Sequence, residues 1–336
     1  LTQIQKATPN DDYLVFDNSD ISIDALEGND IIITGSGNDT VLGNAGDEEI
    51  ITKAGNDIIE GGEGSDTIDS GAGDDTISGN SGDDTMYAQR GNDSLDGGEG
   101  NDILDGGSGN DTFIGGLGND TLISESGDDT YIYNSGDGID LVQDTFGEDT
   151  LILNDGISAS DIIIKTSGNG NLTVALKEIG VSFEKLSNKI VLENWLDRAN
   201  RIEKIQLSTG ENIKLIDYIE ITDENDTIFL DDFANTVDAK AGDDTVITGY
   251  ESDIVSGGSG NDKIFTSKGN DTIIGGSGND LLYGGLGDDT YKYGENDGVD
   301  VIHDSSKDDT DPTLYSYENE AHGSGANAGN DTLEFT

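Results

Sequence analysis

Cysteine is absent from this chain of 336 residues, so no disulfide can cross-link the fold. Histidine occurs only twice, and zinc, which prefers cysteine and histidine ligands, therefore has little to bind. The sequence also lacks any run of about 18 or more apolar residues, which excludes a hydrophobic transmembrane helix. We expect a protein without a membrane span that is stabilised by a metal other than zinc.

Positive charge is scarce as well. Sixteen Lys and Arg stand against 71 Asp and Glu, which gives a net charge of −55, and only 32% of the residues are hydrophobic. Such a chain repels itself and has little apolar surface to offset chain entropy, so it should be disordered in plain water. Nucleic acid and anionic membrane surfaces would be repelled, and neither is expected as a partner. Multivalent cations are the partners that this composition favours.

Motifs of common enzyme classes are missing. The sequence contains no G-x-S-x-G, no H-E-x-x-H and no phosphate-binding GK[ST], and His303 and His322 stand apart from any such motif. The chain begins with Leu1 and shows no signal peptide, so we interpret it as a piece of a longer protein. We expect no enzyme in this region, with any catalytic domain elsewhere in the parent chain.

A nine-residue repeat of the form G-G-x-G-x-D-x-U-x, with U apolar, fills residues 97–123 and continues in both directions. In steps of nine from Asp30 to Asp129, the sixth place is Asp in eleven of twelve copies, and Glu48 is the exception. A second array runs from Asp226 to Asp289, with Asn235 as its one departure. Turns alone do not require Asp at so regular a spacing.

The repeat predicts a fold. Glycine holds the fourth place of every copy from Gly28 to Gly127, which indicates a backbone with positive φ. The three residues x-U-x are enough for one short strand with its middle side chain turned inward. If each glycine loop reverses the chain, two nonapeptides make one coil of eighteen residues. We therefore predict an all-β fold, a parallel β-roll formed as a right-handed solenoid with two nonapeptides per coil.

Stacked coils predict metal sites. Sixth-place carboxylates of adjacent coils would lie about 4.8 Å apart and repel by roughly 3 kcal/mol. Ca²⁺ fits between them because it accepts 6 to 8 oxygens, including loop carbonyls, in tolerant geometry, whereas Mg²⁺ demands a tighter octahedron. We expect about ten ions in the first roll and about four to six in the second, with incomplete sites at Glu48, Asn235 and the loop at Glu251. The predicted ligands are Asp30, Asp39, Asp57, Asp66, Asp75, Asp84, Asp93, Asp102, Asp111, Asp120, Asp129, Asp244, Asp253, Asp262, Asp271, Asp280 and Asp289.

The repeats also suggest domain boundaries. A segment that alternates apolar and polar residues separates the two arrays and predicts antiparallel strands. The expected parts are a lead-in with degenerate cap repeats (1–27), a first roll with its cap (28–144), a β-rich flanking module (145–222), a shorter second roll (223–304), and an insertion followed by the start of a second flanking module (305–336).

With these motifs in view, the chain resembles the RTX (repeat-in-toxin) calcium-binding proteins. The resemblance covers residues 28–133 and 242–293, and the Y-x-Y-x-x-G-D-G-x-D segment at 131–140 resembles the flanking region of haemolysin-like and adhesin-like members. It implies a calcium-binding β-roll exported unfolded through the type I secretion apparatus of a Gram-negative bacterium and folded outside the cell. It also implies a fragment of a large secreted toxin or adhesin, with a cell-surface or glycan target reached through other domains.

Two other functions stay open. One is a calcium-dependent carbohydrate-binding module of a secreted enzyme or adhesin. The other is an ice-binding roll that uses seventh-place threonines such as Thr67, Thr76 and Thr85, although Ile58 and Ile103 interrupt that row. Threonine at this place also agrees with ordinary strand preference.

Overall fold

The computed structural model describes residues 7–166, 170–195, 200, 202–219, 221–294, 297–303 and 332–335. The chain forms two compact units, Leu1–Ile213 and Lys214–Thr336. Within the described residues both units are built from β-strands and short 3₁₀ turns without an α-helix. No helix in this part of the chain has the length and apolar character that a membrane crossing needs.

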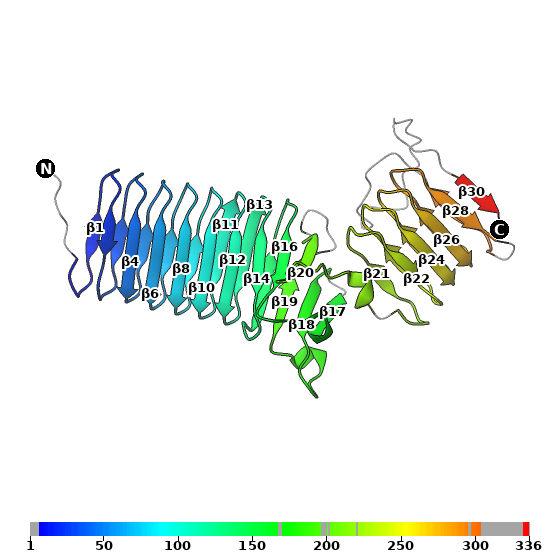
Figure 1. The fold of residues 1–336 in the computed structure, drawn as a ribbon, viewed down its shortest axis with the longest axis horizontal. Helices are drawn as coiled ribbons and strands as arrows, with labels where there is room; N and C mark the ends of the chain where they lie inside the picture. Colours follow the sequence, from blue (N-terminus) through cyan, green and yellow to red (C-terminus); the bar gives the residue numbers. More distant parts are fainter. Residues whose placement is uncertain are drawn as a thin grey trace. The chain divides into compact units, whose positions relative to one another are not determined.

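The first unit contains two sheets whose strands alternate along the chain (Figure 1). The first sheet has the spatial order β1 (Tyr13–Val15), β3 (Ile31–Ile33), β5 (Glu49–Ile51), β7 (Thr67–Asp69), β9 (Thr85–Tyr87), β11 (Ile103–Ser108), β13 (Thr121–Ser126), β15 (Ile139–Gln143), β19 (Lys189–Leu192), β18 (Leu172–Leu176), β17 (Ile162–Thr166). The second has the order β2 (Ser22–Asp24), β4 (Thr40–Ala45), β6 (Ile58–Glu63), β8 (Thr76–Ser81), β10 (Ser94–Glu99), β12 (Thr112–Leu117), β14 (Thr130–Tyr133), β16 (Thr150–Leu153), β20 (Lys204–Leu207).

The register shows the eighteen-residue coil directly. In β10 and β12, Leu95 lies opposite Phe113 in parallel pairing, and the strand pairs from β1 to β14 keep this offset, apart from an irregularity at Gly107 where β11 pairs with β13. Eighth-place side chains from Ile32 to Tyr131 are at most 1% exposed, because each points into the space between the two sheets. The prediction of an all-β parallel β-roll is thereby confirmed.

The segment after the first repeat array adds strands to the roll. β15 pairs in parallel with β19, and β16 pairs in parallel with β20, so both sheets continue beyond residue 144. β17, β18 and β19 pair antiparallel, as the alternating pattern indicates. The 3₁₀ turns η1 (Ala159–Asp161) and η2 (Phe183–Lys185) connect this segment, and Trp195, 1% exposed, donates its indole N–H to the Ile202 carbonyl at 3.0 Å. The compact unit therefore includes most of the segment assigned to a separate flanking module.

The second unit repeats the roll on a smaller scale. After the 3₁₀ turn η4 (Leu215–Asp217), all strand pairs of the two sheets are parallel. One sheet has the order β21 (Thr227–Phe229), β23 (Thr245–Ile247), β25 (Lys263–Phe265), β27 (Leu281–Tyr283), β29 (Val301–His303). The other has the order β22 (Thr236–Asp238), β24 (Ile254–Ser259), β26 (Thr272–Ser277), β28 (Thr290–Tyr293), β30 (Thr332–Phe335).

Candidate metal centre

A ladder of hydrogen bonds joins the sixth-place residues along each edge of the roll. The backbone N–H of Asp93 donates to Oδ1 of Asp111 at 2.8 Å, and the N–H of Asp111 donates to Oδ1 of Asp129 at 2.7 Å. The same bond joins Asp84 to Asp102 on the other edge and Asp271 to Asp289 in the second roll. One oxygen of each carboxylate is thus held by the preceding coil, which fixes where the second oxygen lies.

The second carboxylate oxygen is the unusual feature. These Asp side chains are at most 2% exposed, yet within the described residues Oδ2 receives no hydrogen bond at a large subset of them. The subset includes Asp30, Asp39, Asp84, Asp93, Asp102, Asp111, Asp244, Asp262 and Asp280. A buried charged oxygen without a donor is costly unless a cation accompanies it.

Hydroxyl side chains approach some of the other carboxylates, mostly on one edge of each roll. Ser124 donates its Oγ–H to Oδ2 of Asp129 at 2.5 Å. Burial raises the pKa of Asp57, Asp75, Asp253 and Asp271 above the usual value. A hydroxyl group at the first place of the same nonapeptide partly lowers each pKa again; these residues are Thr52, Ser70, Thr248 and Thr266. The two edges of a roll are therefore not chemically equivalent.

Glycines let carbonyl oxygens approach the carboxylates. A Cβ built on Gly79 would stand 2.3 Å from Oδ2 of Asp84 and 2.7 Å from the carbonyl oxygen of Gly97. Only glycine leaves this space open, and oxygens of both kinds border it. The donor set, hard oxygens without nitrogen or sulfur, fits Ca²⁺.

Burial raises the pKa of these carboxyl groups. Desolvation is the largest cause, and neighbouring carboxylates add to it. The pKa of Asp84, Asp93 and Asp111 rises to about 7, that of Asp102 and Asp120 to about 6. In the second roll burial raises the pKa of Asp271 to about 8. Without a cation, the ionised row is therefore unfavourable near neutral pH.

The two departures from Asp occupy the same positions in the stack. Glu48 is 2% exposed, its N–H donates to Oδ1 of Asp66 at 2.8 Å, and neither of its carboxylate oxygens receives a hydrogen bond from the described residues. Burial and the charge of Asp66 raise the pKa of Glu48 to about 8. Asn235 donates its side-chain amide to the backbone carbonyls of Asp231 and Phe233 and offers one uncharged oxygen. The expectation of incomplete sites at both positions stays a prediction.

The stack extends past Asp129, which the sequence reasoning missed. After a two-residue insertion, Asp120 donates its N–H to Oδ1 of Asp140 at 3.1 Å, and Asp129 donates to Oδ1 of Asp149 at 2.8 Å, in each case twenty residues apart. In the second roll, Asp280 likewise donates to Asp300 at 3.0 Å. The G-D-G-x-D and G-E-D-T segments were the sequence signal for this extra coil.

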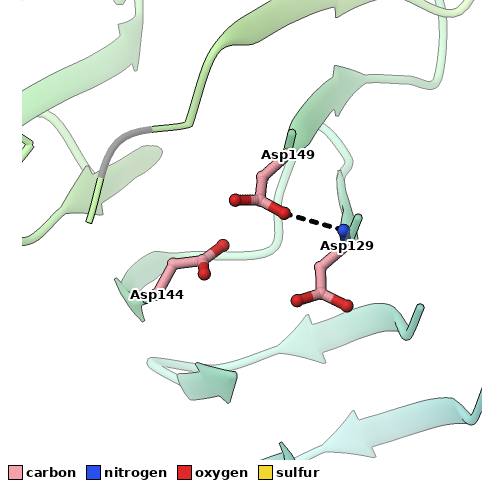
Figure 2. Close-up of side chains that lie close together, drawn as sticks. All are labelled: Asp129, Asp144 and Asp149. Atoms are coloured by element: carbon pink, nitrogen blue, oxygen red, sulfur yellow. Dashed lines mark hydrogen bonds between the residues drawn. The ribbon is translucent and has the colours of Figure 1, made fainter. Parts of the chain in front are cut away.

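Asp144 had no such signal. Its carboxylate lies with those of Asp129 and Asp149 at the end of the stack, with one oxygen of each residue within 4.8 Å of the others (Figure 2). All three side chains are at most 3% exposed.

Comparisons with known proteins give one family match and a likeness to solved structures. A family model, the RTX calcium-binding nonapeptide repeat in four copies, matches residues 22–47, 42–77, 78–113, 96–131, 105–139, 221–255, 229–264 and 256–291. No curated protein matches. Among solved structures, the extracellular lipase LipA from Serratia marcescens matches with 16% identity and a TM-score of 0.16, over 68% of this chain and 32% of the lipase.

The lipase likeness carries no argument about function, and this chain spans only about a third of the lipase's length. The family match is of a different kind, because it covers both rolls at the loops whose carboxylates are buried and stacked. Since the matched segments together exceed half of the sequence, the chain belongs to the family of RTX calcium-binding nonapeptide-repeat proteins.

Proposed function

We propose that this calcium-binding module is unfolded where calcium is scarce and folds outside the cell when Ca²⁺ binds between its stacked loops. In this role it supports type I secretion and presentation of a larger toxin or adhesin of a Gram-negative bacterium. Any catalytic or target-binding domain lies elsewhere in the parent chain.

The buried row of carboxylates carries the proposal. Oδ2 of Asp84, Asp93, Asp102 and Asp111 is buried and receives no hydrogen bond from the described residues. Folding brings these charges together, and the net charge of −55 on the whole chain opposes folding. A ligand that binds only the folded state shifts the equilibrium toward it, so Ca²⁺ supplies the missing stabilisation.

Each residue type has its own part in the binding. The Asp carboxylates at the sixth place supply the charge, with Oδ1 fixed by a neighbouring N–H and Oδ2 left for the ion. Glycines at the first place leave room for carbonyl oxygens such as that of Gly97. The eighth-place aliphatic side chains hold the two sheets together once the loops are neutralised. We propose about ten ions up to Asp129 in the first roll and about four to six in the second.

The location of folding follows from ion concentration. Free Ca²⁺ is roughly micromolar or lower inside cells and roughly millimolar outside, so mass action favours the folded state only outside. An unfolded chain can pass through a secretion channel, and folding afterwards keeps it from returning.

The test is far-UV circular dichroism of the chelated protein during titration with Ca²⁺, with Mg²⁺ as the control. A cooperative coil-to-β transition with Ca²⁺ alone is expected, because Mg²⁺ dehydrates reluctantly and demands a tighter octahedron. A chain that is already β-structured in chelator would contradict the proposal, since no ion would then be needed for folding.

The carbohydrate-binding alternative lacks support from the described residues. Phe265, Tyr283 and His303 form an aromatic column on the second roll, with centroids 4.8 Å apart and interplanar angles of 16° and 8°. Within the column each ring covers a face of its neighbour, so the stacked faces are not available as a platform for sugars. We therefore keep calcium-dependent folding as the proposed function.

A further inference from the structure

The three-carboxylate cluster at the end of the first roll differs from the sites along the stack. Asp129 and Asp149 continue the ladder, but Asp144 stands at the first place of its nonapeptide, where the earlier coils of this edge have uncharged residues such as Ser70, Gly106 and Ser124. A carboxylate therefore stands where those coils have no charge. The Tyr131 hydroxyl donates to Oδ2 of Asp144 at 2.9 Å, which fixes the carboxylate.

The free oxygen of Asp144 points to a ligand. Asp144 is 3% exposed, and within the described residues its Oδ1 is buried and receives no hydrogen bond. Figure 2 shows this carboxylate turned toward those of Asp129 and Asp149. Three carboxylates in so small a buried space would repel one another strongly without a cation.

The oxygens lie close enough to share one cation. One oxygen of each residue lies within 4.8 Å of the others. A set of carboxylate oxygens without nitrogen or sulfur fits a hard cation such as Ca²⁺. The carbonyl oxygen of Gly127 lies on the same loop edge, since a Cβ on Gly147 would stand 1.9 Å from it and 2.4 Å from Oδ1 of Asp149. A further neutral oxygen ligand is therefore at hand.

We propose that Asp129, Asp144 and Asp149 form a calcium site with three carboxylates. This site binds Ca²⁺ more tightly than the sites between the earlier coils of the roll. The inference rests on the calcium binding proposed above and adds a ligand that the nonapeptide does not contain. A higher ligand charge raises calcium affinity. Because Asp149 also donates its N–H to Oε2 of Glu203 at 2.7 Å, the ion joins the last loops of the roll to the segment that carries β20.

The second array repeats this arrangement in its sequence. Asp289, Asp304 and Asp331 correspond to the three residues of the cluster, although Asp304 and Asp331 lie outside the described residues. Experiments on the first cluster should therefore be made in the whole chain, where the second array contributes equally to every variant.

The test counts Ca²⁺ bound to the wild-type chain and to two variants by equilibrium dialysis over a range of free Ca²⁺. Asp144→Asn removes the third carboxylate. Asp128→Asn is the matched control, because it removes one charge beside Asp129 at an exposed place where other repeats have Asn. Its Oδ1 can still accept the Glu148 N–H. We expect Asp144→Asn to lose the earliest binding step and to bind that ion only with the later ones, while Asp128→Asn binds like wild type.

Equal early binding in wild type and Asp144→Asn would overturn the inference. If the wild type itself showed no calcium-dependent folding, the proposed function would fail instead, so the two failures are distinguishable. Circular dichroism at saturating Ca²⁺ checks that the variants fold.

A second measurement covers the case in which Asp144→Asn does not fold. Tb³⁺, which substitutes for Ca²⁺, emits when a nearby tyrosine is excited. Tyr131→Phe should then lose most of the sensitised emission at the first equivalent of Tb³⁺, because the Tyr131 hydroxyl touches Asp144. Tyr133→Phe is the control, since its hydroxyl bonds to the Gly138 carbonyl instead. Unchanged emission in Tyr131→Phe would contradict the site.

Discussion

The backbone N–H of Asp149 donates a 2.7 Å hydrogen bond to Oε2 of Glu203, 54 residues further along the chain. This bond continues the ladder that joins sixth-place residues throughout the roll, with a glutamate from outside the repeats as the last acceptor. Lys204–Leu207 then pairs with Thr150–Leu153 as the next strand of the sheet. The roll therefore ends on a residue that no nonapeptide contains.

Removing this acceptor should weaken the end of the roll. In Glu203→Ala the buried N–H of Asp149 loses its partner, and we expect the free energy of unfolding at saturating Ca²⁺ to fall by about 1 to 3 kcal/mol. Glu203→Gln keeps an oxygen acceptor and should lose less. Urea unfolding followed by emission of the single tryptophan, Trp195, gives the values. Glu211→Ala, at an exposed side chain, is the control, and a similar loss there would refute the explanation.

A fourth-place glycine should be irreplaceable for steric reasons. Gly64 has φ of +129°, and a Cβ on it would lie 1.5 Å from the carbonyl oxygen of Gly46. Gly156 also has positive φ, but nothing stands within 4 Å of its Cβ position. Gly156→Ala should therefore cost about 1 to 2 kcal/mol from backbone strain alone. We expect Gly64→Ala to cost at least twice as much in the same urea experiment, and equal costs would show that the close stacking is unimportant.

The narrow core should be sensitive to loss of volume at its aromatic end. Phe113 is fully buried and stacks on Tyr131 with centroids 5.0 Å apart. Phe113→Ala should lower the free energy of unfolding at saturating Ca²⁺ by about 3 to 5 kcal/mol, through lost burial and a cavity. Ile103→Ala, at a side chain 41% exposed, should cost much less. Calorimetry or urea unfolding checks both, and a small loss at Phe113 would mean that the core can collapse around the gap.

Acid should partly replace calcium. Burial raises the pKa of Asp84, Asp93 and Asp111 from 3.8 to about 7, so the calcium-free folded state binds protons more tightly than the unfolded state. The stability that these protons give to the calcium-free folded state is therefore fully present below about pH 4 and is lost as the pH rises through about 7. In chelator, the β signal in circular dichroism should increase between pH 7 and pH 4.

Calcium binding should show the opposite dependence on pH. Protons and Ca²⁺ compete for the same carboxylates of the folded state, so the amount of Ca²⁺ bound at a fixed free Ca²⁺ concentration should fall as the pH falls from 7 to 4.5, as equilibrium dialysis would show. A chelated protein that is equally unfolded at pH 8 and pH 4.5, or Ca²⁺ binding that does not weaken in acid, would contradict the assignment of the buried row as the binding groups.

The sequence by itself determined the roll and its rows of carboxylates. In a solenoid, the repeat length fixes which residues become neighbours, so Asp93 must lie beside Asp111 once the eighteen-residue coil is known. The apolar eighth place fixes the inward face, and the fourth-place glycine fixes the turn. These are local and periodic relationships, and a single pattern of nine residues contains them all.

The tertiary structure alone decided how the roll ends and which oxygen remains for an ion. A two-residue insertion changes the step to Asp149 to twenty residues, and a further 54 residues separate Asp149 from Glu203, so no period predicts this contact. Asp144 joins the last loops because it stands at the first place of its nonapeptide, where the preceding coil has Ser124, and because the Tyr131 hydroxyl holds its carboxylate. Periodicity predicts neighbours only while the chain repeats; beyond that point, packing of unlike segments selects the partners.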